Sequence, residues 1–298
     1  MTRTSPTGRS GPLVTIGICN LDSPDTIDRC INSALRQTYP CTEVILVDDA
    51  STDGVVAHLQ QHYGSQITIL ENAGNRGAGY SRNVILDHAN GEFTAFFDSD
   101  DKAMPDRISQ QIDCILTNEE TSGSGVVSLA NFDLFVGEHH LERTFALGEQ
   151  QAAYSGSQAV ALVWYVLLKH SGIRFLRSRL PVAPYDYHLG TSLMAARTSV
   201  FRAYRFDDAL RRMQDLDLLL RFCEDGGTIA SSGDHCVNIH AYEKGYKRWS
   251  VVLENFSTIL GKHTASFAGN ITRHHSLAAW LNGIMISVHR CRERFWTN

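Results

Sequence analysis

Carboxylates gather directly after an apolar stretch at residues 93–97. Phe96 and Phe97 lead at once into Asp98, Asp100 and Asp101. A buried strand that ends in clustered carboxylates is costly unless a cation or hydrogen-bond donors lie opposite them. Divalent cations such as Mg²⁺ take carboxylate oxygens together with substrate phosphates. The stretch therefore predicts a metal–diphosphate site, and a solvated acidic turn that caps the next helix is the alternative.

A second acidic pair, Asp48 and Asp49, follows the apolar stretch 43–47. Because ligands of open α/β sheets bind at the carboxyl ends of the strands, we expect both acidic groups at one edge. One group can accept hydrogen bonds from a base and a ribose. The other can hold a cation that bridges a diphosphate. Capping of the helix that follows Ser51 is the alternative for this pair.

The glycine-rich loop 74–79 precedes a predicted helix, so its backbone N–H groups could face an anion. Its spacing is not that of the dinucleotide-binding fingerprint, and it follows the third predicted strand instead of the first. Arg76 or Arg82 could add positive charge there. A flexible loop with a surface arginine is the alternative.

Two further groups lie in the second half of the chain. Asp215 begins a predicted apolar helix, where the helix dipole keeps a carboxylate ionised, so it is either a helix cap or a general base. His240 ends a short predicted strand and is followed by lysines, tyrosines and an arginine that could meet phosphates. A solvated loop is the alternative for this second group.

The periodicity of apolar residues predicts the elements that would position these groups. Predicted strands cover 13–19, 43–47, 67–70, 93–97, 126–130, 190–196 and 237–240, with 132–136 as a hairpin partner of 126–130. Predicted helices cover 27–35, 55–63, 80–88, 105–116, 158–169 and 216–223. Strands that alternate with helices indicate βαβ units and a mostly parallel sheet.

The composition of the chain excludes several classes of protein. The 298 residues are 43% hydrophobic and 20% charged, which is ordinary for a globular chain, and we expect one mixed α/β domain. A net charge of −5 argues against a nucleic-acid-binding protein. The seven cysteines lack zinc-site spacing and indicate free thiols in a reducing cytosol. No apolar run approaches the ~20 residues that cross a bilayer.

The two ends of the chain differ from the rest. Residues 1–11 are polar and rich in Gly, Ser and Thr, which predicts a disordered lead-in without the apolar region of a signal peptide. Apolar residues recur at helical spacing over 277–291, and three arginines crowd the end of this stripe. A terminal helix packed on the domain is one interpretation. Peripheral membrane contact or dimerisation through 275–295 is the other.

Taken together, these motifs resemble the family 2 inverting glycosyltransferases of GT-A fold. The likeness rests on Val47-Asp48-Asp49-Ala50-Ser51, on Asn75-Arg76-Gly77 through Ser81-Arg82-Asn83, on Phe97-Asp98-Ser99-Asp100-Asp101 as a DXD motif, and on Gln214-Asp215 before a helix with Asp217 and Arg221. It is strong over 12–118, moderate over 186–242 and absent from the tail. The combination of motifs is specific, whereas each motif alone is not.

The resemblance implies a nucleotide-binding, Rossmann-like mixed sheet flanked by helices, with a C-terminal helical extension. The GT-A domain would span 12–262, with a donor-nucleotide half (12–118) and an acceptor half (119–262), and the extension would span 263–298. It further implies an inverting, hexosyltransferase-type enzyme that uses Mg²⁺ or Mn²⁺ and a UDP-sugar donor. The acceptor would be a hydroxyl of a glycan, a lipid-linked sugar or a small molecule. We expect a cytoplasmic protein, and a place at the inner face of the membrane is the alternative to a free one.

Site roles also follow from the resemblance, residue by residue. Asp49 would contact the base, Asp98 the ribose or sugar, and Asp100 the metal, with His240 as a further metal ligand. Asp215 would take the proton of the acceptor hydroxyl as general base. The donor site would be completed by Cys19, Asn20, Asn75, Arg82 and Ser99.

Two residues depart from the family pattern. Leu21 stands where relatives often have tyrosine, which puts the aromatic contact with the base in doubt. Gln214 replaces the first acid of Glu-Asp, so the assignment of the base depends on Asp215 alone.

Other classes of protein share some of these motifs. A sugar-1-phosphate nucleotidyltransferase would carry a basic, glycine-rich stretch after its first strand, and this chain has none at 19–23. A receiver-like signalling module would be near ~120 residues, well short of this chain. A non-catalytic nucleotide-sugar-binding subunit is the third alternative, and intact Asp98, Asp100 and Asp215 argue against it.

Overall fold

A computed structural model describes residues 11–136, 139–147, 153–171, 180, 187–240 and 249–270. The lead-in 1–10 and the stripe at 277–291 lie outside these described residues. The strands within them are β1 Val14–Asn20, β2 Thr42–Asp48, β3 Thr68–Glu71, β4 Phe93–Asp98, β5 Lys102–Ala103, β6 Val126–Val136, β7 His139–Thr144, β8 Ala153–Tyr154, β9 Met194–Arg197 and β10 Thr228–His240. The helices are α1 Ile27–Leu35, α2 Val55–Tyr63, α3 Ala78–His88, α4 Arg107–Ser122, α5 Gly156–His170, α6 Thr198–Tyr204, α7 Gln214–Glu224, α8 Trp249–Lys262 and α9 Thr264–Asn270.

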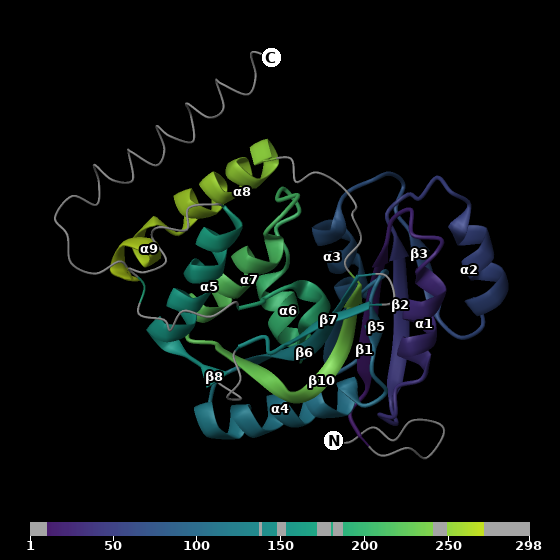
Figure 1. The fold of residues 1–298 in the computed structure, drawn as a ribbon, viewed down its shortest axis with the longest axis horizontal. Helices are drawn as coiled ribbons and strands as arrows, with labels where there is room; N and C mark the ends of the chain where they lie inside the picture. Colours follow the sequence, from purple (N-terminus) through teal and green to yellow (C-terminus); the bar gives the residue numbers. More distant parts are fainter. Residues whose placement is uncertain are drawn as a thin grey trace, which may run out of the picture.

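A mixed sheet forms the centre of the molecule (Figure 1). The strand order along it is β3-β2-β1-β4-β9-β6-β10-β5, with β7 paired to β6 and β8 to β10. The strands β3, β2, β1 and β4 run parallel to one another, while β9 is antiparallel to both of its neighbours, β4 and β6. This confirms the βαβ units and the GT-A-like architecture expected from the sequence.

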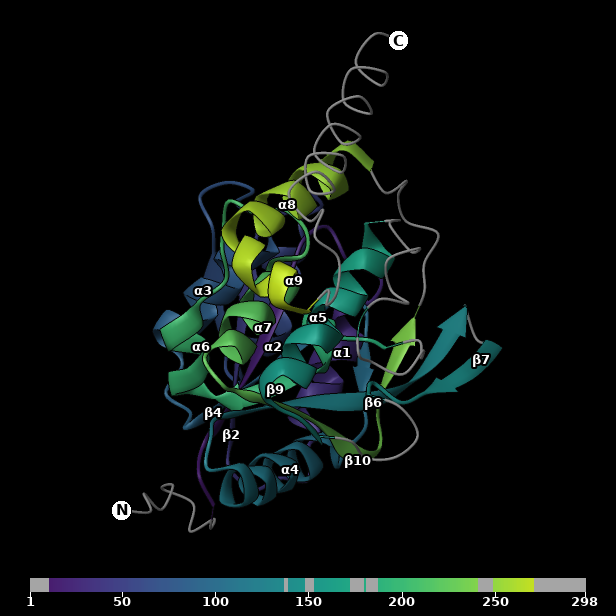
Figure 2. The same cartoon turned by 90° about the vertical axis from the view of Figure 1, so that its left-hand side faces the viewer.

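Helices cover both faces of the sheet because alternate strand residues point to opposite sides. Val44 and Leu46 of β2 pack with α1, α2 and α4, whereas Ile45 and Val47 pack into a second core with α3 and α5–α9. Figure 2 shows α4 beneath β6 and β10, and α5 to α9 on the other side of these strands. Within the described residues, no helix is both long and apolar enough to cross a membrane.

Parallel pairing brings the acidic groups of the first half to one edge. In the register of the sheet, Asn20 at the end of β1 lies beside Asp48 of β2, and Cys19 lies beside Asp98 of β4. The side chain of Asn83 in α3 then joins this half to the second half. It donates to the carbonyl of Phe206 at 2.8 Å and accepts from the N–H of Phe206 at 3.0 Å.

In the second half, one sequence-based prediction was wrong and two others had the wrong bounds. The stretches 126–130 and 132–136 form one strand, β6, and its hairpin partner is β7 instead. Asn131 does not break β6, because its amide donates to the carbonyls of Ser232 and Gly233 and its Oδ1 accepts from the N–H of Ala146. The predicted strands 190–196 and 237–240 are, respectively, a short helical turn followed by β9, and the last part of the longer β10.

A buried carboxylate of α7 forms an ion pair with the last residue of α8. Asp217 is fully buried, and it accepts hydrogen bonds from Arg221 at 2.9 Å and from Lys262 at 3.2 Å. The imidazole of His263 lies 3.6 Å from Asp217 and 2.8 Å from Glu224. Although burial opposes ionisation, the proximity of His263 and the charges and hydrogen bonds of Arg221 and Lys262 lower the pKa of Asp217 to about 2.

We expect Asp217→Asn to lower the free energy of unfolding by about 1–3 kcal/mol, because Asp217 is buried and its charge-assisted hydrogen bonds to the half-exposed Arg221 and Lys262 are lost. Since the pKa of Asp217 is lowered on folding, its stabilisation is present above pH ~4 and is lost as the pH falls toward 2. Urea denaturation at pH 7 measures the change, with Asp208→Asn at an exposed position as the control. Equal stability of the two variants would contradict the anchoring role of Asp217.

Candidate active site

Asp98, Asp100 and Asp101 lie together at the turn after β4. One ligand oxygen from each of the three lies within 4.8 Å of the others. Asp101 is buried, and this burial and the charges of Asp98 and Asp100 raise its pKa well above the usual value. Like charges held this close favour a bound cation. The three carboxylates, which are hard oxygen donors, therefore fit a Mg²⁺ or Mn²⁺ ion.

A buried arginine contacts the strand that leads into the turn with Asp98, Asp100 and Asp101. Arg107 at the start of α4 donates to the carbonyls of Phe96 at 2.9 Å and Ser192 at 2.7 Å, and its guanidinium lies 4.1 Å from the ring centroid of Phe97. Burial lowers its pKa to about 10, which leaves it charged at neutral pH. Sequence reasoning missed Arg107, because a charged residue in an amphipathic helix is normally expected at the surface.

The acidic pair after β2 has structural partners on both residues. Asp48 accepts from the amide of Asn20 at 2.8 Å and from Ser51 N–H at 2.8 Å, so Ser51 binds Asp48 and does not cap α2, whose N-cap is Gly54. Asp49 accepts from the N–H groups of Arg76 and Gly77 in the glycine-rich loop and from the amide of Asn72, two residues before the loop. Asp49 thereby fixes the conformation of this loop. Whether it also contacts a base stays a prediction.

The remaining predicted donor residues surround this edge. Arg82 of α3 is buried and its Nη2 lies 3.1 Å from Asp98, while its Nη1 has no hydrogen-bond partner within the described structure. Cys19 and Asn20 end β1, and burial raises the pKa of the Cys19 thiol to about 12. Two more residues complete the predicted donor site, Ser99, which donates to Ser23 at 3.3 Å, and the exposed Asn75.

A cleft of about 530 Å³ joins the two halves of the chain. Its wall contains Arg82 and Asp98 from the first half and Asp215 from the second. The side chain of Asp215 accepts from Leu216 N–H at 2.9 Å and from Thr191 at 3.4 Å. Burial raises the pKa of Asp215, against the opposing charge of Arg82. The cleft thus brings Asp215, the predicted base, and Asp98 of the carboxylate group to the wall of one space.

His240 is not part of the carboxylate group formed by Asp98, Asp100 and Asp101. It ends β10, and its ring stacks on Phe135 of β6 with the ring centroids 5.3 Å apart. Among the described residues, the compact carboxylate group consists of Asp98, Asp100 and Asp101, without His240. Its role as a metal ligand therefore stays a prediction.

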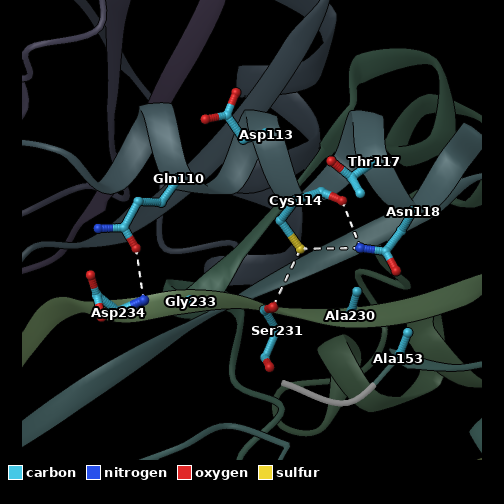
Figure 3. A pocket seen from close by; sticks show the side chains of 10 residues that line it. All are labelled: Gln110, Asp113, Cys114, Thr117, Asn118, Ala153, Ala230, Ser231, Gly233 and Asp234. Atoms are coloured by element: carbon cyan, nitrogen blue, oxygen red, sulfur yellow. Dashed lines mark hydrogen bonds between the residues drawn. The ribbon is translucent and has the colours of Figure 1, made fainter. Parts of the chain in front are cut away.

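A second cavity, of about 450 Å³, lies between α4 and β10 (Figure 3). Cys114 of α4 and Ser231 of β10 both line it, and the thiol donates to the carbonyl of Ser231 at 3.4 Å. None of the predicted site residues contributes to its wall. The first cleft, by contrast, is lined by three of them, Arg82, Asp98 and Asp215.

Comparison with known proteins identifies the fold and its family. The sequence profile described as "Glycosyl transferase family 2" matches residues 15–177. The chain belongs to this family. This chain is 29% identical over 225 residues to the putative glycosyltransferase EpsE of Bacillus subtilis (strain 168). The match covers 73% of this chain and 69% of EpsE.

A second relative is named by its reaction. This chain is 33% identical over 126 residues to the UDP-Glc:alpha-D-GlcNAc-diphosphoundecaprenol beta-1,3-glucosyltransferase WfgD of Escherichia coli. This match covers 42% of the chain and 50% of WfgD. Among solved structures, S. aureus TarS 1–349 in complex with UDP-GlcNAc superposes with a TM-score of 0.59 at 18% identity, over 83% of this chain and 66% of TarS 1–349. At that identity the likeness establishes the fold.

Proposed function

We propose that this family 2 glycosyltransferase moves a sugar from a UDP-sugar to a hydroxyl acceptor, with inversion at the anomeric carbon and with a divalent cation. The observation that carries the proposal is the shared cleft, in which Asp98 and Asp215 come from opposite halves of the chain. TarS 1–349 forms a complex with UDP-GlcNAc, and WfgD is named for a UDP-sugar donor and a lipid-linked acceptor. Both names support a UDP-sugar donor here, and the name of WfgD alone supports a lipid-linked acceptor.

The carboxylates of the first half would hold the donor. Asp100 and its neighbours at the metal turn would ligate Mg²⁺ or Mn²⁺, and Asp98 would meet the ribose or the sugar. When bound, the cation would neutralise charge that develops on the leaving diphosphate. Arg82 has one buried nitrogen without a partner in the described structure, and that nitrogen can donate to an oxygen of the donor.

Asp215 would act on the acceptor. A carboxylate held at the start of α7 by Leu216 N–H can accept the proton of an acceptor hydroxyl that lies within about 3 Å. Its raised pKa brings it closer to the pH at which a general base is most effective. Attack from the side opposite the diphosphate inverts the anomeric centre without a covalent intermediate.

Release of UDP from a panel of UDP-sugars tests this function. We expect the purified protein to release UDP from at least one UDP-sugar with MnCl₂ or MgCl₂ present, by slow transfer to water or faster transfer to an added acceptor. Excess EDTA should abolish the release. Failure to bind UDP and to release it from every UDP-sugar would contradict the proposed donor class.

A further inference from the structure

Three cations line the cleft, against two carboxylates. The cations are Arg82, Arg211 and Arg212, and the carboxylates are Asp98 and Asp215. Two of the arginines are held by neighbours. Arg82 pairs with Asp98, as described above, and Arg211 donates to the side chain of Asn75 at 3.2 Å.

Arg211 is also packed against the glycine-rich loop. A Cβ built on Gly77, whose φ is +90°, would lie 2.7 Å from the Nη1 of Arg211. Only glycine fits this position without displacing the guanidinium. Arg211 therefore belongs to the donor side of the cleft, where it joins the loop to the segment before α7.

Arg212 differs from both. Its guanidinium is exposed and makes no hydrogen bond or ion pair with any residue that the structure describes. Its backbone is nevertheless held, because its carbonyl accepts from the side chain of Asn255 in α8 at 2.9 Å. Arg212 thus places on the cleft wall a positive charge that no described residue pairs with, three residues before Asp215.

Gln214 supplies a second, independent observation. It exposes only 8% of its surface, lines the same cleft, and its Oε1 has no partner among the described groups. A buried polar atom left without a hydrogen bond is costly, so a ligand that supplies one is favoured. Rotation of the amide by 180° exchanges Oε1 and Nε2, and in that orientation the buried position holds an N–H donor that can bind an anion. A carboxylate at this position would repel an anion.

We propose that the acceptor carries a phosphate group that binds Arg212 and the amide of Gln214, while its hydroxyl reaches Asp215. The inference rests on the proposed transferase function and names the acceptor class. A phosphate suits these two partners because it offers several acceptor oxygens, one for a guanidinium and another for an amide. The phosphate can belong to a soluble sugar phosphate or to a lipid-linked sugar.

Calorimetry on the full chain, saturated with UDP and MgCl₂ so that the donor site is filled, tests the proposal. The probes are N-acetylglucosamine 1-phosphate, the same sugar on a short alkyl diphosphate, and its neutral methyl glycoside. We expect both phosphate compounds to bind at least about 10-fold more tightly than the methyl glycoside, as expected when one charge-assisted hydrogen bond is gained. Similar affinities of the two phosphate probes indicate a sugar phosphate, and tighter binding of the alkyl diphosphate indicates a lipid-linked acceptor.

Two variants assign the effect to these residues. Arg212→Gln should reduce the affinity for the phosphate probes about 10-fold, and Arg36→Gln, which removes an exposed arginine outside the cleft wall, should not. Gln214→Glu should weaken the phosphate probes and leave the methyl glycoside unchanged. Lack of a phosphate preference in the wild-type chain, or equal losses in the Arg212 and Arg36 variants, would overturn the proposal. UDP release from the donor would be unaffected by that outcome, so the proposed function would stand.

Discussion

Asp100→Ala is expected to abolish transfer almost completely while the fold persists. Asp100 shares its turn with Asp98 and Asp101, and removal of one of the three leaves a poorer set of oxygen ligands for the cation. Without the cation, the charge of the leaving diphosphate is not neutralised. UDP release and UDP affinity in MnCl₂ measure the two consequences, and both should fall.

Asp113→Ala is the matched control, because Asp113 is an exposed aspartate of α4 outside the cleft wall. It should retain the activity and metal response of the wild type. Thermal unfolding should show that both variants are folded. Full activity of the wild type in a chelator, or normal activity of Asp100→Ala, would contradict the metal assignment.

Asp215→Asn is expected to slow transfer by ~10²–10⁴-fold, the usual effect of losing a general base. Asparagine keeps the size of the side chain and much of its hydrogen bonding, but it cannot take the proton of the acceptor. UDP affinity in MnCl₂ should be unchanged, because Asp215 contacts neither the nucleotide nor the cation in the proposed arrangement. Single-turnover rates separate this effect from slow product release.

The pH profile provides a second readout for Asp215. Its pKa is raised above the usual value, chiefly by burial, and the base must be ionised to act. Activity should therefore decline as the pH falls through this raised pKa, and Asp215→Asn should lose that acid limb. Asp208→Asn, at an exposed position outside the cleft wall, should keep it. A wild-type transfer rate in Asp215→Asn would reduce Asp215 to a helix cap.

The first half of the fold could be predicted from the sequence because its signals are local. The apolar stretches that became β1, β2 and β4 are buried, and the helix predicted at 55–63 has those bounds in the structure. The second half depends on contacts between distant residues. The continuity of β6 through Asn131, for example, relies on carbonyls of residues 232 and 233.

In the candidate site, too, some residues could be predicted from local sequence signals and others depend on contacts between distant residues. Asp98, Asp100 and Asp215 could be found from their places at the ends of predicted elements. Arg107 and Asp217 could not be assigned their partners, because a sequence does not show that Arg107 meets the carbonyl of Ser192 or that Asp217 meets Lys262. The uncommitted Arg212 also required the structure, since its free guanidinium is known only from its surroundings.

The configuration of the new glycosidic bond gives the most direct test that a hydroxyl held by Asp215 attacks the sugar opposite the diphosphate. With an α-linked UDP-sugar that the donor panel identifies and an acceptor that speeds UDP release, the product can be analysed by proton NMR after removal of the metal. The cleft geometry and a single base predict a β-linked product. An α-linked product would contradict inversion and, with it, the role of Asp215 as the base.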